Sequence, residues 1–259
     1  MEEQALLSEV QEQVRALGPW HFDIEIANGV RTKDFNRAAY GNVDLDKVGV
    51  IDPLEMKELL KLILPGGIVG KRFLDVGCNA GGYCFVAHEL GASECFGFDI
   101  REHWINQAQF IKSLKYSGVD SIQFRVADVK TFTHRHTYDV TLFKGIFYHI
   151  PDPISTLRSI CDLTDRAIII DTASRSDIPA ECMSPWREST THVMSGVDGL
   201  AWFPGGPEVI QPILTWAGFT HMRVVQHKKG DASERFRGRF RVIATRKEFD
   251  LSAYDAAKM

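Results

Sequence analysis

The stretch 72–82, with the sequence Arg-Phe-Leu-Asp-Val-Gly-Cys-Asn-Ala-Gly-Gly, constrains the fold of this chain more than any other segment. Its apolar beginning is typical of a short buried strand, and the small residues that follow predict a tight turn. A helical pattern runs from Tyr83 to Leu90, so the stretch predicts a strand, a turn and a helix in that order. The start of such a helix offers unpaired N–H groups and a partial positive charge to a bound ligand.

The spacing of the small residues differs from the dinucleotide-binding fingerprint, which places three glycines as G-x-G-x-x-G after the strand. Here the order is Asp75-x-Gly77-x-Asn79-x-Gly81, and a second acid, Asp99, follows 24 residues after Asp75 at the end of another apolar run. The pattern resembles motif I of the class I S-adenosylmethionine (SAM) methyltransferases, with Asn79 in place of a glycine. Asparagine tolerates the left-handed backbone that such a turn requires. A generic strand–turn–helix unit whose acids cap helices is the alternative.

The resemblance implies that SAM, with S-adenosylhomocysteine (SAH) as its product, binds across the loops at the carboxyl ends of the parallel strands. It also implies that Asp99 binds the ribose and that Asp128 receives the adenine amino group. Lys144 would meet a carboxylate of SAM or of the substrate, or else lie on the surface. The cofactor-binding residues expected on this basis are Asp75, Gly77, Cys78, Asn79, Gly81, Asp99, Ile100, Asp128, Val129 and Lys144.

Strands and helices alternate up to about residue 171, which predicts a parallel sheet with right-handed crossovers. Two further strands, at about 221–228 and 238–246, follow each other too closely for a crossover helix and must therefore be antiparallel. The predicted fold class is α/β: a Rossmann-like class I methyltransferase sheet, mostly parallel with a terminal antiparallel hairpin and with helices on both faces.

Two segments are expected outside this sheet. Residues 1–50 are read as a helix over 2–17 followed by an arm whose residues Trp20–Ile26 alternate like a strand. The arm is either a lid that carries Trp20 and Phe22 onto the ligands or a segment that only packs on the domain. Residues 51–259 form the expected SAM-binding domain, with a cap insertion at about 172–205 that lacks clear periodicity.

Further motifs resemble one methyltransferase subgroup, that of the bacterial enzyme that carboxymethylates the wobble uridine of tRNA, with its uncharacterised relatives. They are Gly145-x-x-Tyr148-His149-x-x-x-Pro153, Asp171-Thr172 and Trp202-Phe203-Pro204. The tRNA enzymes have a lysine just before a Gly-Pro pair; in this chain the pair is Gly18-Pro19 and the residue before it is Leu17. The first seventeen residues hold four acids and a single basic residue, Arg15. Burying the extra carboxylate of carboxy-SAM without cations is costly, so ordinary SAM is favoured.

His149 is the expected general base, because it lies at the active end of the fourth strand and an imidazole titrates near neutral pH. A histidine that only orders its loop is the equal alternative. Tyr148 is the second expected catalytic residue, as a pocket residue or as part of the core. No metal is expected, because His134 and His136 lack a matching pair of ligands.

The substrate is expected to contact aromatic and basic side chains. The cap contributes Trp186 and Trp202, which are suited to a flat or apolar substrate or else form the cap's own core. Residues 221–247 hold nine Lys or Arg residues against two acids, and Arg235 and Arg237 would rim the active site and bind an anionic substrate. A solvated sheet end, kept soluble by its charge, explains the same pattern.

Bulk properties exclude several classes of protein. No apolar run is long enough to span a membrane, and the acidic start is unlike a signal peptide, so a cytoplasmic protein is expected. Five cysteines without a C-x-x-C pair indicate neither a disulfide framework nor a zinc site. The expected function is SAM-dependent methylation of O, N or C of a small, anionic or aromatic metabolite. The alternatives are tRNA wobble-uridine modification and a non-catalytic SAM-fold binding protein.

Overall fold

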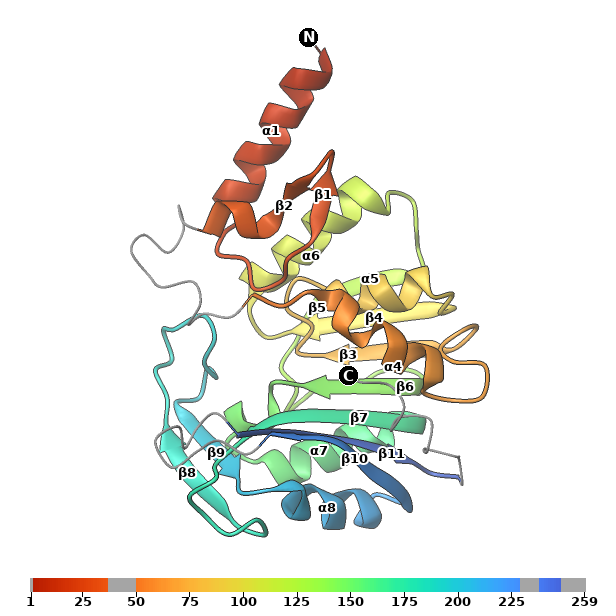
Figure 1. The fold of residues 1–259 in the computed structure, drawn as a ribbon, viewed down its shortest axis with the longest axis vertical. Helices are drawn as coiled ribbons and strands as arrows, with labels where there is room; N and C mark the ends of the chain where they lie inside the picture. The colour runs from red at the N-terminus through yellow and green to blue at the C-terminus, as the bar shows by residue number, and fades with distance from the viewer. Residues whose placement is uncertain (1, 37–49, 229–237, 248–259) are drawn as a thin grey trace.

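A seven-stranded sheet forms the centre of the computed structural model, which describes residues 2–36, 50–228 and 238–247 (Figure 1). The strand order is β10-β11-β7-β6-β3-β4-β5. In chain order the strands of this sheet are β3 (Arg72–Val76), β4 (Glu94–Asp99), β5 (Ile122–Val126), β6 (Tyr138–Lys144), β7 (Thr164–Ser174), β10 (His221–Lys228) and β11 (Gly238–Thr245).

The direction of the strands confirms the predicted fold class. Strands β5, β4, β3, β6 and β7 are mutually parallel, whereas β11 is antiparallel to both β7 and β10. Strand β10 therefore runs in the same direction as the parallel strands. The segment between β10 and β11 accordingly leaves the sheet at the edge where the parallel strands end, beside the last residues of β7.

Helices cover both faces of the sheet (Figure 1). Helices α4, α5 and α6 pack on one face with α1 beyond them, and α7 and α8 pack on the other. None of the described helices is long and apolar enough to cross a membrane. The helices are α1 (Glu2–Ala16), α4 (Lys57–Leu62), α5 (Gly82–Glu89), α6 (Glu102–Lys115), α7 (Pro153–Asp162) and α8 (Ile210–Trp216), and the 3₁₀ turns are η1 (Thr32–Phe35), η2 (Pro53–Met56), η3 (Phe147–His149) and η4 (Pro207–Val209).

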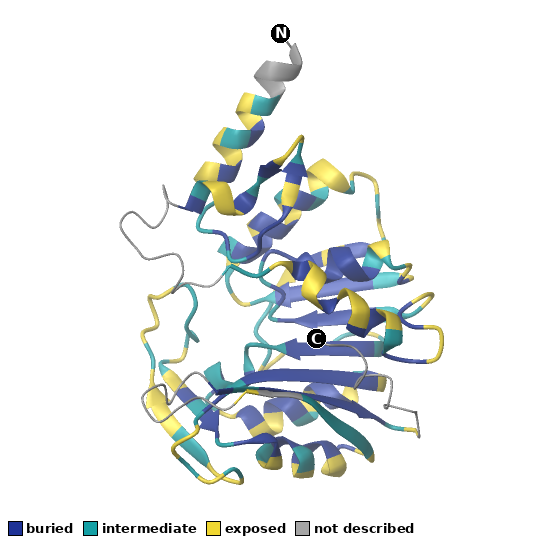
Figure 2. Cartoon of the chain, in the orientation of Figure 1, coloured by how far each residue is buried: buried dark blue, intermediate teal, exposed yellow. Residues whose placement is uncertain are grey.

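Alternation along the strands divides the core into two layers. In β7, Ile169 packs with one layer and its neighbours Ile168 and Ile170 pack with the other, as the period of two in a strand requires. Figure 2 shows the inner strands of the sheet largely buried and the exposed residues of α7 and α8 on their outer sides. All five cysteines are free thiols, and only Cys182 is exposed.

The N-terminal arm is less regular than the sequence predicts. Only Glu25–Ala27 (β1) and Val30–Arg31 (β2) form strands in the described part of the arm, and they meet at a turn at Asn28 and Gly29, where φ is positive at both residues. The backbone before Glu25 bonds elsewhere: Trp20 N donates to Asn36 Oδ1 at 2.8 Å, and Asp23 N donates to Ile51 O at 2.8 Å. The expected strand over Trp20–Ile26 is therefore wrong for its first five residues.

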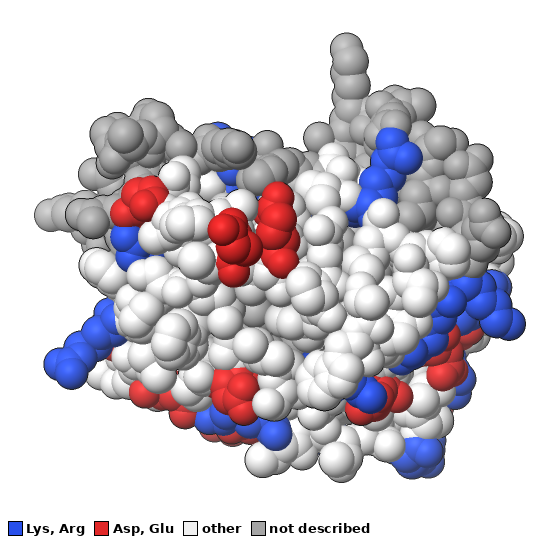
Figure 3. Space-filling view, turned by 90° about the horizontal axis from the view of Figure 1, so that it is seen from below, with Lys and Arg blue, Asp and Glu red and all other residues white. Residues whose placement is uncertain are grey.

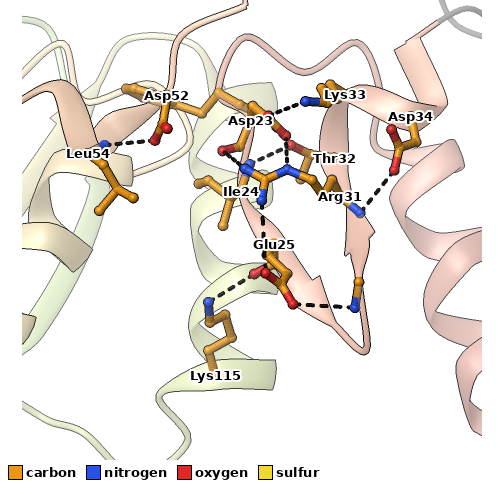
Figure 4. A network of polar contacts seen from close by, with 12 residues as sticks. Asp23, Ile24, Glu25, Arg31, Thr32, Lys33, Asp34, Asp52, Leu54 and Lys115 are labelled. Atoms are coloured by element: carbon orange, nitrogen blue, oxygen red, sulfur yellow. Dashed lines mark hydrogen bonds and ion pairs between the residues drawn. The ribbon is translucent and has the colours of Figure 1, made fainter.

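Polar contacts hold the arm together and attach it to α6 (Figure 4). Asp23 accepts from Arg31 Nε at 2.9 Å and lies 2.8 Å from Lys33 Nζ. Burial raises the pKa of Asp23, but these two cations outweigh it and hold that pKa below the ordinary value. Lys115 of α6 donates to Glu25 O at 2.9 Å, so the arm is fixed to the helix behind it.

Trp20 is part of this packing. Its side chain is fully buried, and its indole Nε1 donates to Val14 O at 2.7 Å, which joins the arm to α1. Gln107 of α6 donates to the carbonyl oxygens of Leu17 and Pro19, both at 2.7 Å. The structure therefore gives Trp20 a place between α1 and the arm, where it contacts no ligand-binding surface.

The cap contains an antiparallel hairpin that was not predicted from its sequence. Strands β8 (Met183–Arg187) and β9 (Leu200–Pro204) pair with each other, apart from the central sheet. Trp202 donates from Nε1 to Pro151 O at 3.1 Å, and Phe203 stacks on Tyr148 with 5.0 Å between the ring centroids. The hairpin therefore packs against the turn η3, on the side where the parallel strands end (Figure 1).

The buried indole of Trp20 predicts a stability difference between two tryptophans. We expect Trp20→Phe to lower the free energy of unfolding by about 1–3 kcal/mol, because it leaves the Val14 carbonyl unpaired and removes buried volume. Trp216 is 65% exposed, so Trp216→Phe should change that free energy by less than about 0.5 kcal/mol. Denaturant unfolding of both variants measures the difference, and equal midpoints would contradict it.

Candidate functional site

A cavity of about 390 Å³ lies at the carboxyl ends of the parallel strands. The loops after β3, β4, β5 and β6 form its walls, which is where ligands bind in open α/β sheets. From these loops the lining includes Gly77, Asn79, Asp99, Ile100, Arg101, Asp128, Val129, Lys130, Lys144, Tyr148 and His149. His21 and Phe22 of the arm, residues 193–198 of the cap, and Arg239 of β11 complete it.

The turn after β3 adopts the conformation that its small residues predict. The φ angles of Gly77, Asn79 and Gly81 are 72°, 50° and 78°, and only glycine or asparagine takes such values readily. A Cβ atom at Gly77 would lie 2.4 Å from Cγ2 of Ile146, so any larger residue there displaces the loop after β6. Cys78 and Gly81 do not line the cavity; they support the turn from behind.

Asp99 joins this turn to the end of β4. Its Oδ2 accepts from Asn79 N at 3.1 Å, and its Oδ1 accepts from Arg101 N at 3.0 Å. Burial raises the pKa of Asp99, and the two backbone N–H groups oppose that shift because they favour the charged form. The carboxyl group is thus fixed in the cavity wall by main-chain donors.

Asp75 is more deeply enclosed than Asp99. Its side chain is buried, and Oδ2 has no hydrogen-bond partner among the described residues. Burial and the nearby Asp99 raise the pKa of Asp75 to about 8, and Lys144 opposes them. The carboxyl group is therefore mostly protonated at neutral pH, although it lies directly beneath the turn.

Asp128 and Val129 line the cavity next to the end of β5. Asp128 Oδ1 accepts from Lys130 N at 2.9 Å, which holds the carboxylate in the loop. Lys130 lies 2.6 Å from Asp198 Oδ1 in the cap, and this contact raises the pKa of the lysine despite the loss of solvation. The loop after β5 thus contacts both the cavity and the cap.

A cluster of charges occupies the other side of the cavity, around the fully buried Asp171 at the end of β7. Arg241 Nε donates to Asp171 Oδ2 at 2.7 Å, and Arg239 Nε lies 2.5 Å from Oδ1. Lys144 Nζ lies 3.8 Å from Asp171 and 3.3 Å from Glu55. Burial raises the pKa of Asp171, but the three cations together hold it below its ordinary value.

Tyr148 and His149 both line the cavity from the turn η3. Burial raises the pKa of Tyr148, and Arg239 opposes that shift. His149 Nδ1 lies 2.8 Å from both carboxylate oxygens of Glu188, a cap residue that immediately follows β8. A residue of the cap, outside the loop that carries His149, therefore fixes the position of the imidazole.

The segment 188–198, which we name the roof segment, lies over the cavity. One terminal nitrogen of Arg101 donates to the carbonyl oxygens of His192 and Ser195, at 3.0 and 2.9 Å. With Lys130–Asp198 and His149–Glu188, the roof segment is attached to residues that follow β4, β5 and β6. Three neighbouring loops therefore fix it.

The structure brings most of the predicted site residues into one place. Of the predicted substrate residues, Phe22 lines the cavity; Trp20 is buried in the arm, and Trp186 and Trp202 lie in the hairpin without lining the cavity. Arg235 and Arg237 lie outside the described residues.

The sequence predictions missed His21, Arg101, Glu188 and Arg239 as site residues. A signal existed for Arg239, because it continues the basic alternation of the terminal hairpin and β11 pairs with β7. Glu188 carried no such signal: it lies in a polar stretch without periodicity, 39 residues from His149.

Comparison with known proteins identifies the domain. A family model described as a methyltransferase domain matches residues 69–222, which is more than half of the chain. The chain is 27% identical over 172 residues to the tRNA U34 carboxymethyltransferase of Campylobacter lari, covering 64% of this chain and 55% of that enzyme. It is 33% identical over 135 residues to the ubiquinone biosynthesis O-methyltransferase of a Shewanella species, covering 50% and 55%. The chain thus spans about half the length of these relatives.

Two solved structures resemble the fold. The N-terminal domain of EvdMO1, crystallised with SAH bound, gives a TM-score of 0.72 at 18% identity and covers 93% of this chain and 97% of that one. Magnesium protoporphyrin IX methyltransferase from Synechocystis PCC 6803, crystallised with SAM bound, gives a TM-score of 0.55 at 18% identity and covers 82% and 89%.

The raised pKa of Asp75 predicts how the free energy of unfolding depends on pH. The folded pKa of about 8 exceeds the ordinary value of 3.8, so the folded state holds a proton that the unfolded state releases. Asp75 therefore costs stability as pH rises from about 4 to 8, by at most about 1.4 kcal/mol per pH unit. We expect Asp75→Asn to gain stability relative to wild type across this range, and to gain no more above pH 8.

Denaturant unfolding of both proteins between pH 5 and 9 measures this difference. Asp120→Asn is the matched control, because Asp120 is exposed and its replacement should leave the pH dependence unchanged. A stability difference between Asp75→Asn and wild type that does not vary with pH would contradict the prediction.

Proposed function

The chain belongs to the methyltransferase-domain family and is a class I SAM-dependent methyltransferase; on that premise we propose that it methylates a small metabolite that carries a negative charge. The observation that carries this proposal is the surplus of cations in the charge cluster around Asp171, of which Lys144 and Arg239 line the cavity. Lys144, Arg239 and Arg241 are balanced only by Asp171 and Glu55 among the contacts of this cluster.

We propose that SAM binds in the half of the cavity below β3, β4 and β5. Asp99 would accept hydrogen bonds from the ribose, Asp128 would receive the adenine amino group, and Ile100 and Val129 would enclose the base. The turn with Gly77 and Asn79 would face the methionine end, and the unpaired Oδ2 of Asp75 beneath it offers a further polar partner. When bound, SAM supplies an electrophilic methyl group on a sulfonium.

The substrate would occupy the remaining part of the cavity, between the roof segment and the cationic cluster. Arg239 is half-buried, lines the cavity and contacts Asp171 through its Nε, and a guanidinium carries further N–H donors beside that one. A carboxylate or phosphate there would neutralise the surplus charge, and charge-assisted hydrogen bonds are the strongest that a side chain forms. Phe22, Tyr83 and Tyr148 also line the cavity and favour a flat or aromatic body.

Modification of tRNA is the second candidate, and the tRNA U34 carboxymethyltransferases among the relatives favour it. The roof segment argues against it, because three loops fix this segment over the cavity that a nucleotide base would have to enter. On the face in Figure 3, the coloured basic and acidic residues lie in small separate groups, and they form no broad basic surface there. Extended contact with RNA phosphates requires such a surface. A protein that binds SAM without turnover is the third candidate.

Mass spectrometry of the small molecules released by denaturing the freshly purified protein tests the proposal first. SAM or SAH would support the proposed donor, whereas carboxy-SAM would favour the tRNA reading. If no nucleoside is released and titration calorimetry with SAM shows no heat of binding, the proposed donor site is wrong. Bound SAM without methyl transfer to any acceptor would favour the third candidate, a protein that binds SAM without turnover.

The charge of Arg239 predicts a selective effect on anionic acceptors. Methyl transfer from radiolabelled SAM is measured for pairs of acceptors that differ only in charge, such as 4-hydroxybenzoate and 4-hydroxybenzamide. For the best acid, Arg239→Gln should raise KM about tenfold or more, because it removes roughly one charge-assisted contact. For the corresponding neutral amide, KM should change by less than about threefold. Lys228→Gln removes an exposed cation of β10 and should change neither. Equal effects of Arg239→Gln on acid and amide would contradict an anion site.

A further inference from the structure

We propose that Glu188 positions His149 as the general base for a hydroxyl acceptor, so that the methyl group is transferred to oxygen. This inference rests on the proposed function, because it concerns the acceptor side of the same methyl transfer. It adds a residue from the cap to the reaction, and it chooses between the O, N and C acceptors that the sequence left open.

The contact between the two side chains fixes where the imidazole proton lies. A carboxylate only accepts hydrogen bonds, so the Nδ1 of His149, which is 2.8 Å from both oxygens of Glu188, must donate. In a neutral imidazole the other nitrogen, Nε2, then carries the lone pair. The side chains are only 17% and 9% exposed, so water competes little for this bond.

The backbone of the roof segment is shaped around this pair. Gly196 N donates to Glu188 Oε2 at 2.9 Å, which is shorter than its 3.2 Å contact with His149 Nδ1. A Cβ atom at Gly196 would lie 2.5 Å from His149 O and 3.0 Å from Glu188 Oε2, so glycine permits the approach. Glu188 N also donates to Gly199 O at 3.0 Å, which holds both ends of the roof segment together.

Other titratable groups in the cavity wall are already engaged. Lys144 contacts Glu55 and Asp171, and Tyr83 donates to Glu55 at 2.5 Å. Asp99 is held by two backbone N–H groups. Burial raises the pKa of Tyr148, which makes its phenol a poor base near neutral pH. His149 thus keeps a second nitrogen that has no partner among the contacts of the described residues, on the side of the ring opposite Glu188.

A held base with a free lone pair suits an O–H acceptor. An amine presents its own lone pair to the methyl group, whereas an alcohol or phenol becomes a strong nucleophile only as its proton leaves. The acceptor oxygen forms a bond to the methyl carbon, the carbon–sulfur bond breaks with its electron pair on sulfur, and the acceptor proton moves to Nε2 of His149. Glu188 then faces the resulting imidazolium and stabilises its charge. His149 would be the catalytic residue and Glu188 its positioning residue.

The tautomer of His149 provides a test that needs no substrate. Full-length protein labelled with ¹⁵N-histidine and saturated with SAH is examined by NMR at pH 8, where a free imidazole is largely neutral. His149→Asn identifies the resonances of this ring. We expect a proton on Nδ1 in wild type. In Glu188→Gln we expect a shift toward the Nε2–H form, because a glutamine amide can donate to Nδ1 as well as accept from it. A ring protonated on Nε2 in wild type, or a ring unaffected by Glu188→Gln, would overturn the proposal.

Kinetics with the best acceptor from the charge-matched pairs provides the second test. His149→Asn should lower kcat about 10²–10⁴-fold, and Glu188→Gln about 10-fold or more, with KM and the Kd for SAM within about threefold of wild type. Glu188→Asp should restore part of the loss in kcat. Glu181→Gln, which removes an exposed carboxylate two residues before β8, is the matched control and should keep wild-type activity. Unfolding midpoints of all variants detect a purely structural effect.

The outcomes distinguish this inference from the proposed function. Absence of SAM binding and of methyl transfer refutes the proposed function, whatever the NMR spectra show. Methyl transfer to a nitrogen or carbon atom, or unchanged kcat in Glu188→Gln, refutes the inference and leaves the proposed function standing.

Discussion

The carboxylate of Asp171, which is fully buried, is the interaction on which the rest of the structure depends. It lies near the end of β7, opposite Arg241 of β11, and it also contacts Arg239 and Lys144 of β6. A buried carboxylate is stable only with well-placed cations, and removal of one partner typically costs about 3–5 kcal/mol. The contact therefore fixes the register of the antiparallel strand on the parallel sheet. It also brings three cations to the edge where the cavity lies.

The second constraint is that residues next to the proposed SAM ligands also hold the cap. Arg101 follows Asp99 by two residues and binds carbonyl oxygens of the roof segment, and Lys130 follows Asp128 by two and binds Asp198. Binding of a ligand by either loop and closure of the roof segment thus involve the same short stretches of backbone. The contact between Glu188 and His149 adds a third attachment. The cap is therefore part of the cavity wall.

The sequence predicts most of the sheet because apolar runs mark strands such as β4, β6 and β7, whereas β5 alternates apolar and polar residues. Strand Arg72–Val76 and helix Gly82–Glu89 follow the strand, turn and helix predicted from residues 72–90. The cap hairpin was missed because its strands are short and β8 has no buried residue, so β8 shows no alternation of buried and exposed positions. Glu188 was missed, and the sequence leaves the role of Trp20 open, because their contacts depend on a partner distant in the chain and on a buried carbonyl that no sequence pattern reveals.

The two buried carboxyl groups near the cavity, Asp75 and Asp171, differ in charge, and this difference affects the distribution of charge around the cavity. Asp171 stays ionised because three cations surround it, whereas Asp75 has only Lys144 to oppose burial and the nearby Asp99, and its pKa rises to about 8. At the cavity itself, Asp99 and Asp128 contribute carboxyl groups at the ends of β4 and β5, and Lys144 and Arg239 contribute cations from β6 and β11. A pocket divided in this way favours one orientation of two ligands. Under the proposed function, a nucleoside with hydroxyl and amino donors would bind the wall with the carboxyl groups, and an anionic acceptor would bind the wall with the cations.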